Sequence, residues 1–297
     1  MEKNIEVMNE QNKPRRRGQF ASICLRYSKN KMAMLGLIIF LIVLFFAIFA
    51  GLFADYNFDA IKQNISDRYQ RPNSVHILGT DAYGRDIFAR IIYGARLSLM
   101  ISLSTVMISL VAGCILGALC AYYGGLLDSI IMRITDVFLA VPPTLMAVTV
   151  VAALGTSIPN LILALTISMV PPFTRIVRSA VLQIRGADYI EAAIAYGSKD
   201  AYIIFSHVLP NAIGPIIVQA TVNLASVLLS VTALGFIGLG VPSPRPEWGT
   251  MMAENKAQMR YYPYLVVIPG IVIAATVLSI NLIGDGLRDA LDPKLKN

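Results

Sequence analysis

The most constraining feature of this sequence is a set of six long apolar segments. A helix that crosses a bilayer needs about 20 apolar residues, and each segment comes close to or exceeds that length. Five of the six contain no Lys, Arg, Asp or Glu, and the fourth carries only Arg175, near its end. Because a central charge costs about 2.5–3.5 kcal/mol to insert, these segments predict membrane helices at 34–54, 97–122, 137–154, 158–177, 213–240 and 265–283.

The composition agrees with a membrane protein. Apolar residues make up 56% of the 297 positions and charged residues 14%, whereas a soluble domain has about a quarter charged residues. The first apolar segment is too long, and too far from the start of the sequence, for a cleaved signal peptide. We therefore predict an all-α, polytopic membrane protein with six transmembrane helices.

The basic start of the chain predicts its orientation. Residues 1–33 hold eight Lys or Arg against three Glu, which is +5 of the net charge of +7. Basic residues next to a membrane helix favour the cytoplasmic side, so both termini are expected there. Because the positive charge is concentrated in this tail, it gives no sign of nucleic-acid binding. The loops expected outside the cytoplasm are 55–96, 155–157 and 241–264.

Several segments contain residues that break or tighten helices. Pro142–Pro143 and Pro171–Pro172 are expected to interrupt the third and fourth membrane helices, because proline removes backbone hydrogen bonds. They are candidate hinges, and static kinks are the alternative. The Gly113-x-x-x-Gly117 pattern would allow a close contact between two helices.

The loop between the fourth and fifth segments is too long and too patterned for a simple connector. Asp188 is placed to cap a helix, and Glu191 is placed to return a bond to the cap backbone. Ala192 and Ala193 favour helix, and Gly197 suits the left-handed position that ends one. The loop is therefore expected to begin with a short helix whose end is fixed by glycine.

A second short helix is expected to follow in the same loop. Ser198 is placed to cap it, and Leu209–Pro210 to end it, because the residue before proline is pushed out of helical geometry. Two adjacent helices also suggest a DNA-binding helix-turn-helix. The balanced charge of the loop excludes that interpretation: its charged residues include Arg178, Arg185 and Lys199 against Asp188, Glu191 and Asp200.

These residues carry a resemblance to a known family. Glu191-Ala192-Ala193, then Gly197, then His207-Val208-Leu209-Pro210 resemble the EAA loop of binding-protein-dependent ABC importers. The family's usual pattern has Ile at the position of His207, where peptide-type permeases often carry His. The resemblance implies a type I ABC importer permease fold. It also implies a loop at 188–210 that docks on an ATPase subunit through Asp188, Glu191, Ala192, Ala193, Gly197, His207, Leu209 and Pro210.

A second stretch, at 79–86, resembles the signature of the C-type permease of dipeptide and oligopeptide importers. Its residues are Gly79, Thr80, Asp81, Gly84, Arg85 and Asp86, and they either fold the loop onto the helices or meet the binding protein. Pro246-Glu247-Trp248-Gly249 is similar to a later part of the same family. The implied organisation is a cytoplasmic tail (1–33), a first membrane helix with its external loop (34–96), a permease core (97–285) and a C-terminal cytoplasmic tail (286–297).

The resemblance also implies the partners and the function. The chain is expected to pair with a second homologous permease, two ATPase subunits that bind ATP and Mg, and an extracytoplasmic substrate-binding protein, and to bind no nucleic acid. It would import di- or oligopeptides across the bacterial inner membrane by alternating access. The sequence contains no Gly-x-x-x-x-Gly-Lys-Ser/Thr phosphate loop, so ATP would be bound by the partners.

Two alternatives remain open at this stage. The same machinery could import nickel chelates or glutathione, because the binding protein largely sets the cargo in this family. An intramembrane enzyme would need a nucleophile with its base, or a set of metal ligands, inside the apolar segments. The sequence offers neither, and His76 and His207 are too few and too widely separated for a metal site.

Overall fold

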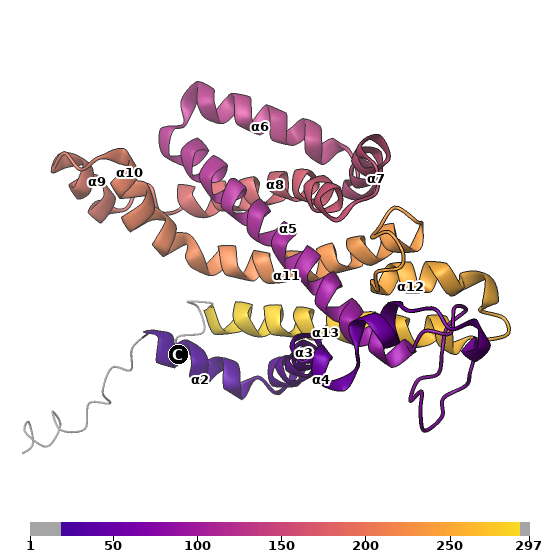
Figure 1. The fold of residues 1–297 in the computed structure, drawn as a ribbon. Coiled ribbons are helices and arrows are strands. Elements are labelled where there is room, and N and C mark those ends of the chain that lie inside the picture. Colours follow the sequence, from indigo (N-terminus) through magenta and orange to yellow (C-terminus); the bar gives the residue numbers. More distant parts are fainter. Residues whose placement is uncertain (1–18, 292–297) are drawn as a thin grey trace, which may run out of the picture.

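The structure is a computed structural model, and its described residues, 19–291, form a bundle of helices (Figure 1). Within this range no named strand forms, although Thr80 and Asp86 pair in an isolated β-bridge. The helices are α2 (Gln19–Lys29), α3 (Lys31–Ile48), α4 (Ala50–Phe53), α5 (Ile87–Tyr123), α6 (Gly125–Ala140), α7 (Pro143–Leu154), α8 (Ile158–Leu182), α9 (Asp188–Ala195), α10 (Asp200–Ile203), α11 (Leu209–Phe236), α12 (Trp248–Asn255) and α13 (Tyr264–Leu291). Shorter π or 3-10 turns are η1 (Tyr56–Ile61), η2 (Ile65–Asp67), η3 (Ile204–Val208) and η4 (Lys256–Gln258).

The number of membrane crossings agrees with the sequence. Among the described residues, five helical segments are long and apolar enough to span a membrane: α3, α5, α8, α13 and the run from α10 to the end of α11. A sixth span exists if α6 and α7 count together as one broken crossing. The prediction of an all-α polytopic fold is confirmed.

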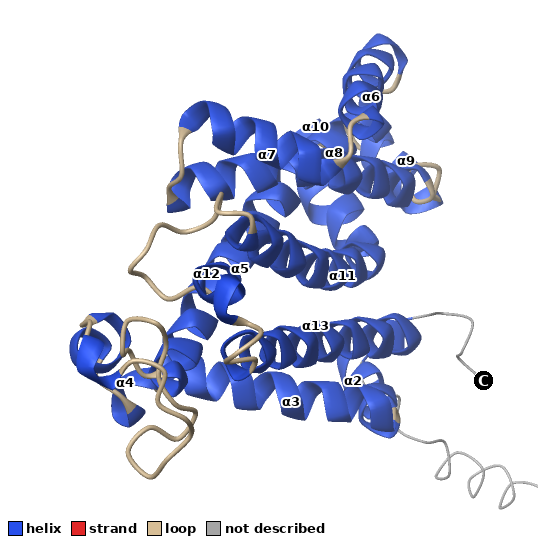
Figure 2. Cartoon of the chain, turned by 90° about the vertical axis from the view of Figure 1, so that its right-hand side faces the viewer, coloured by secondary structure: helices blue, strands red, loops and turns tan. Residues whose placement is uncertain are grey.

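The third membrane helix, expected at 137–154, is interrupted at Pro142–Pro143, as predicted. α6 ends at Ala140, α7 begins at Pro143, and the two are bent by 87° relative to each other. Val141 has an extended backbone (φ −95°, ψ 129°), which is the conformation favoured before a proline. The Pro142–Pro143 pair thus makes a corner between two helices (Figure 2).

The fourth helix is not interrupted at Pro171–Pro172, which corrects the prediction. Both prolines lie inside the continuous helix α8. Tight packing against α5 explains why the helix continues there, since neighbouring helices can hold a segment that has lost backbone hydrogen bonds. A Cβ added at Gly113 would lie 3.0 Å from the Thr174 backbone nitrogen, and one at Gly117 would lie 2.8 Å from the Val177 Cβ. The predicted close contact at Gly113-x-x-x-Gly117 is confirmed.

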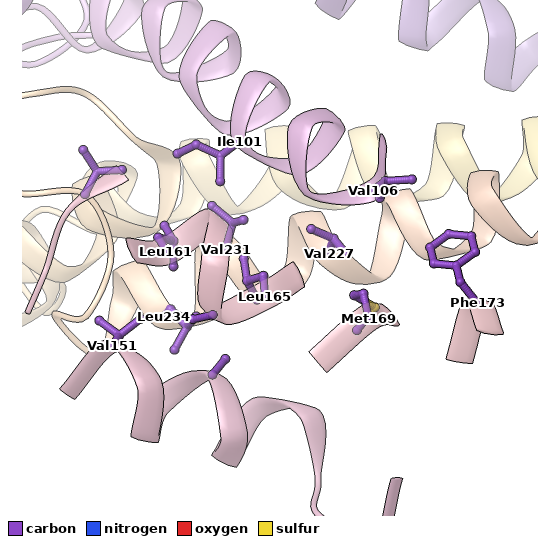
Figure 3. Close-up of a cluster of buried hydrophobic side chains, with 13 residues drawn as sticks. Ile101, Val106, Val151, Leu161, Leu165, Met169, Phe173, Val227, Val231 and Leu234 are labelled. Carbon is purple, nitrogen blue, oxygen red and sulfur yellow. The ribbon is translucent and has the colours of Figure 1, made fainter. Parts of the chain in front are cut away.

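The largest apolar cluster fills the space between four helices. α5 contributes Ile101, α8 contributes Leu165, and α11 contributes Val231, with Val151 of α7 beside them (Figure 3). All four side chains are nearly inaccessible to solvent. A fully buried side chain of this size contributes about 1.5–3 kcal/mol when it leaves water, and inside a bilayer close packing takes over that role.

The bundle has two distinct ends (Figure 1). One end, called here the α9 end, carries α9, α10, α2 and the end of α13. The Asn30 amide, which caps α3, donates to the Asp289 carboxylate of α13 at 3.3 Å. The opposite end, called here the α12 end, carries α12 and the loop between α4 and α5.

Several element boundaries differ from the expected organisation. α5 begins at Ile87, before the expected boundary at 97, and α13 continues to Leu291, beyond the expected start of the C-terminal tail. The expected tail 1–33 contains helix α2 from Gln19 onward. Residues 1–18, with most of the tail's basic residues, and residues 292–297 lie outside the described residues.

Candidate functional site

The loop at the α9 end begins with the predicted short helix. α9 ends in a motif in which the Ser198 amide donates to the Ala193 carbonyl (3.1 Å) and the Gly197 amide donates to the Ile194 carbonyl (2.9 Å). These two hydrogen bonds satisfy carbonyl groups at the end of the helix, and they require a residue with left-handed backbone conformation just after it. Gly197 has φ +76°, so its predicted place is confirmed.

The two predicted side-chain caps are wrong. Asp188 is the first residue of α9 and not its cap. α10 begins at Asp200, so Ser198 lies too far from it to be its cap. Neither helix has a hydrogen bond to a capping side chain. The N-cap positions are Ala187 and Lys199, and each lies one residue away from the residue that was expected to cap the helix. Asp188 and Glu191 still lie in the first turn of α9, where the helix dipole favours negative charge.

Leu209–Pro210 does not end the second helix. Leu209 is helical (φ −60°, ψ −43°), and its amide donates to the Ile204 carbonyl, five residues back. This π-helical turn widens the helix just before Pro210, where an α-helical path would meet the proline ring. The segment 200–236 is therefore one continuous helical run, and the loop passes into α11 without a break.

Buried apolar side chains anchor this loop to the membrane helices. Ile190 of α9 and Ile203, at the end of α10, have no exposed surface and pack in one cluster with Val177 and Val181 of α8. The Tyr122 hydroxyl, near the end of α5, donates to Asp200 at 2.8 Å. The loop is thus fixed to α5 and α8 on its inner face.

The outer face of the loop is apolar and aromatic. Tyr196 is 91% exposed, Phe205 62%, Tyr202 58% and Ile194 53%. Large apolar side chains that are exposed within one short segment indicate an interaction surface. The sequence prediction did not include these residues as contacts, although four aromatic residues within one charged loop, Tyr189 among them, were a usable signal.

The predicted contact residues lie around this face. Glu191 and Ala192 are exposed, whereas Ala193 is half-buried. His207 is half-buried and packs edge-to-face against Tyr202, with ring centroids 5.4 Å apart. Beside Glu191 lies a cavity of about 480 Å³ lined by Tyr122, Leu182, Arg185, Gly186, Ile190, Glu191 and Ile194.

The signature residues at 79–86 lie at the opposite, α12 end. The Arg85 Nε atom donates to Asp81 at 2.7 Å, and its Nη2 atom donates to Glu254 of α12 at 2.7 Å. Arg90 of α5 donates to the same Glu254 oxygen at 3.0 Å. Asp81, Arg85 and Arg90 are almost completely buried, so this cluster folds the loop onto the helices, the first of the two alternatives.

Gly79, Thr80 and Gly84 fit the same loop for steric reasons. Gly79 and Gly84 have positive φ (81° and 74°), and a Cβ at Gly84 would collide with the Asn64 carbonyl. The Thr80 hydroxyl is buried and donates to the Asp67 carbonyl. The pattern Gly-Thr-Asp-x-x-Gly-Arg-Asp is therefore explained by folding of the loop.

Asp86 and Glu247 each cap a helix near this cluster. Asp86 accepts from the Ala89 amide of α5 (2.9 Å) and lies 2.7 Å from His76 Nδ1. Glu247 accepts from the Gly249 and Thr250 amides at 2.9 and 2.8 Å, at the start of α12. Its complete burial raises the pKa of the Glu247 carboxyl above the ordinary value. In residues 19–291 no group of three His, Cys, Asp or Glu side chains could hold a metal ion.

The sequence matches two family descriptions. Residues 109–297 match the family "Binding-protein-dependent transport system inner membrane component". Residues 18–72 match "N-terminal TM domain of oligopeptide transport permease C". The first match covers more than half of the chain, so it shows the family.

Curated relatives span nearly the same length. The chain is 47% identical over 269 residues to the dipeptide transport system permease protein DppC of Alkalihalophilus pseudofirmus, covering 91% of this chain and 88% of the relative. It is 39% identical over 272 residues to the oligopeptide transport system permease protein OppC of Bacillus subtilis, covering 92% and 88%. It is 43% identical over 226 residues to the glutathione transport system permease protein GsiD of Pectobacterium atrosepticum, covering 76% and 75%.

A solved structure shares the fold. The chain resembles a chain of the MetNI methionine ABC transporter in an inward-facing conformation, with a TM-score of 0.56 and 20% identity, covering 68% of this chain and 96% of that chain. At this identity the likeness shows the fold alone. From the family match and these relatives, the chain belongs to the binding-protein-dependent transport system inner membrane components, as a multi-pass permease subunit of the ABC importer type and not an enzyme.

Proposed function

We propose that this permease imports di- and oligopeptides by alternating access, driven by separate ATPase subunits. In the proposed complex it pairs with a second homologous permease, and two ATPase subunits bind ATP and Mg. A substrate-binding protein delivers the cargo from outside. The assignment of peptides as the cargo is supported by two relatives, named for dipeptide and oligopeptide transport, that are 47% and 39% identical to this chain.

The observation that carries the coupling role is the exposed face of the loop at the α9 end. Tyr196, Tyr202 and Phe205 project from a segment whose other side is buried against α5 and α8. A groove on an ATPase subunit would cover this face, with Glu191 and Ala192 at the contact. Because 200–236 is one helical run, a displacement of the loop would move α11 directly, and packed helices of this kind switch between discrete arrangements.

The α9 end is proposed to face the cytoplasm. α2 and the end of α13, the first and last helices of the described residues, lie together at this end (Figure 1). The basic residues of 1–33 favour the cytoplasmic side of the membrane. The α12 end, with the signature loop, would then face the binding protein.

A cargo competition tests the function. The complete transporter is reconstituted in vesicles with its binding protein, and ATP-dependent uptake of radiolabelled Ala-Ala is measured against glutathione and a nickel chelate. We expect saturable uptake of the dipeptide. The 43% identity to a glutathione permease makes glutathione the second candidate, and uptake of glutathione or nickel without dipeptide would reject the peptide assignment.

A further inference from the structure

Arginines at the α12 end of the bundle fall into two groups. Arg85 and Arg90 are buried and paired with Asp81 and Glu254. Arg96 of α5 and Arg245, in the loop before α12, are exposed. Within residues 19–291 neither of these two makes an ion pair or a side-chain hydrogen bond. The guanidinium groups of Arg96 and Arg245 therefore have free donors within this range.

Both free arginines line one cavity of about 570 Å³. Tyr56 and Tyr93 form a wall of it, with their ring centroids 5.0 Å apart and their planes at 67°. Leu97, Met100 and Ile158 give the cavity an apolar side, and no Asp or Glu is among its lining residues. Two like charges that share a cavity without a counter-charge repel each other, so the site favours an anion.

Hydrogen bonds hold the backbone around the cavity in place, although the guanidinium groups of Arg96 and Arg245 have no partner among the described residues. Arg245 stands between Pro244 and Pro246, whose rings restrict the backbone. The Pro244 carbonyl accepts from the buried Arg90 at 3.2 Å, and the Tyr93 hydroxyl donates to the Ala54 carbonyl at 2.9 Å. The buried Arg85–Glu254 cluster thus also holds the loop that presents Arg245.

We propose that Arg96 and Arg245 bind the carboxylate of the incoming peptide at the external mouth of the permease. This inference rests on the proposed function of peptide import. A guanidinium matches a carboxylate with two parallel hydrogen bonds, and every peptide with a free C-terminus supplies that group. The apolar side of the cavity would take the adjoining side chain, so the site would accept peptides of varied sequence.

The test separates cargo transfer from docking of the binding protein. In the complete transporter, Arg96→Gln and Arg245→Gln are combined, and Ala-Ala imported per ATP hydrolysed is measured over a range of binding-protein concentrations. Loss of charge-assisted contacts predicts about tenfold less peptide per ATP, with the same half-saturating concentration of binding protein. Arg96→Lys with Arg245→Lys keeps the charge but loses the paired hydrogen bonds, so it should retain more of the uptake than the double Gln variant and less than the wild type. Arg68→Gln, an exposed arginine of the same external region outside the cavity, should change nothing.

Three results would overturn the proposal. One is unchanged peptide import per ATP in the double Gln variant. Another is a raised half-saturating concentration of binding protein with full import, which would assign the arginines to docking. The third is a loss confined to vesicles containing phosphatidylglycerol, which would assign the cavity to a lipid headgroup. A wild-type transporter that imports no peptide under any condition would instead reject the proposed function.

Discussion

The Nη2 atom of Arg85 lies 2.7 Å from Oε2 of Glu254, a residue 169 positions away in the sequence. This contact joins the loop between α4 and α5 to α12. Asp81 and Arg90 complete the cluster, so two guanidinium groups face two carboxylates. The cluster is balanced in charge and largely buried, which makes each member sensitive to removal of another.

Glu254→Gln should destabilise the α12 end. It leaves two buried arginines with one carboxylate, and breaking a buried pair costs about 3–5 kcal/mol. The free energy of unfolding in mixed detergent measures this loss. The matched control is Asp136→Asn, which breaks the Arg175 pair whose side chains are 56% and 50% exposed; we expect a cost of at most about 1 kcal/mol there. Equal losses in the two variants would contradict the structural role of the cluster.

Gly197→Asp should uncouple ATP hydrolysis from transport while membrane insertion stays intact. At φ +76° a side chain costs about 1 kcal/mol or more, and the motif that ends α9 is lost. Gly186→Asp is the control, because it adds the same charge to the same loop, has no left-handed backbone and meets nothing within 4 Å. Uptake and ATPase activity are measured together. Full uptake by the Gly197 variant would count against the docking role.

Tyr196→Ala and Ile190→Ala should affect the loop in opposite ways. Tyr196 is 91% exposed, whereas Ile190 has no exposed surface. We expect Tyr196→Ala to weaken binding of the ATPase subunits about tenfold or more, as for an aromatic interface anchor, without loss of stability. Ile190→Ala should cost about 2–5 kcal/mol of local stability through a cavity. Titrated ATPase binding and hydrogen exchange in α9 distinguish the two, and strong ATPase binding by Tyr196→Ala would reject the proposed contact face.

The ion pair between α6 and α8 should control the position of α6. Arg178 donates two bonds of 2.6 Å to Asp128, and α6 lies between Gly124–Gly125, both with positive φ, and the Pro142–Pro143 corner. Asp128→Arg should release α6 from α8, and adding Arg178→Asp should restore it. Electron–electron distances between spin labels on α6 and α8 measure this. A failure of the reversed pair to restore the distance would show that the pair does not hold α6.

Much of the fold follows from local sequence features. Apolar length predicted the membrane helices, Gly113-x-x-x-Gly117 predicted a close helix contact, and Gly197 predicted the end of α9. Pro142–Pro143 predicted the break in the third membrane helix, but not its 87° bend, because hydropathy averages over a window and carries no direction. The π turn before Pro210 was missed because the restriction before proline is only a preference of one residue, and Leu209 stays helical against it where the helical turn is widened.

The candidate sites depend more on tertiary contacts. Glu254 is one charged residue in a segment between two membrane helices, and nothing nearby in the sequence indicates that its partners are Arg85 and Arg90. Asp188 and Ser198 were predicted as caps from residue type, but packing of Ile190 and Ile203 decides where the short helices begin. Whether Arg245 pairs with a carboxylate likewise depends on how distant loops fold together.

Dependence of transport on the separate ATPase tests the central claim most directly. Vesicles containing this chain with its partner permease are compared with vesicles that also contain the ATPase subunits, with saturating binding protein, ATP on the α9 side and radiolabelled Ala-Ala outside. The account predicts concentrative uptake only with the ATPases and hydrolysable ATP. Concentrative uptake by the permeases without ATPases would contradict it.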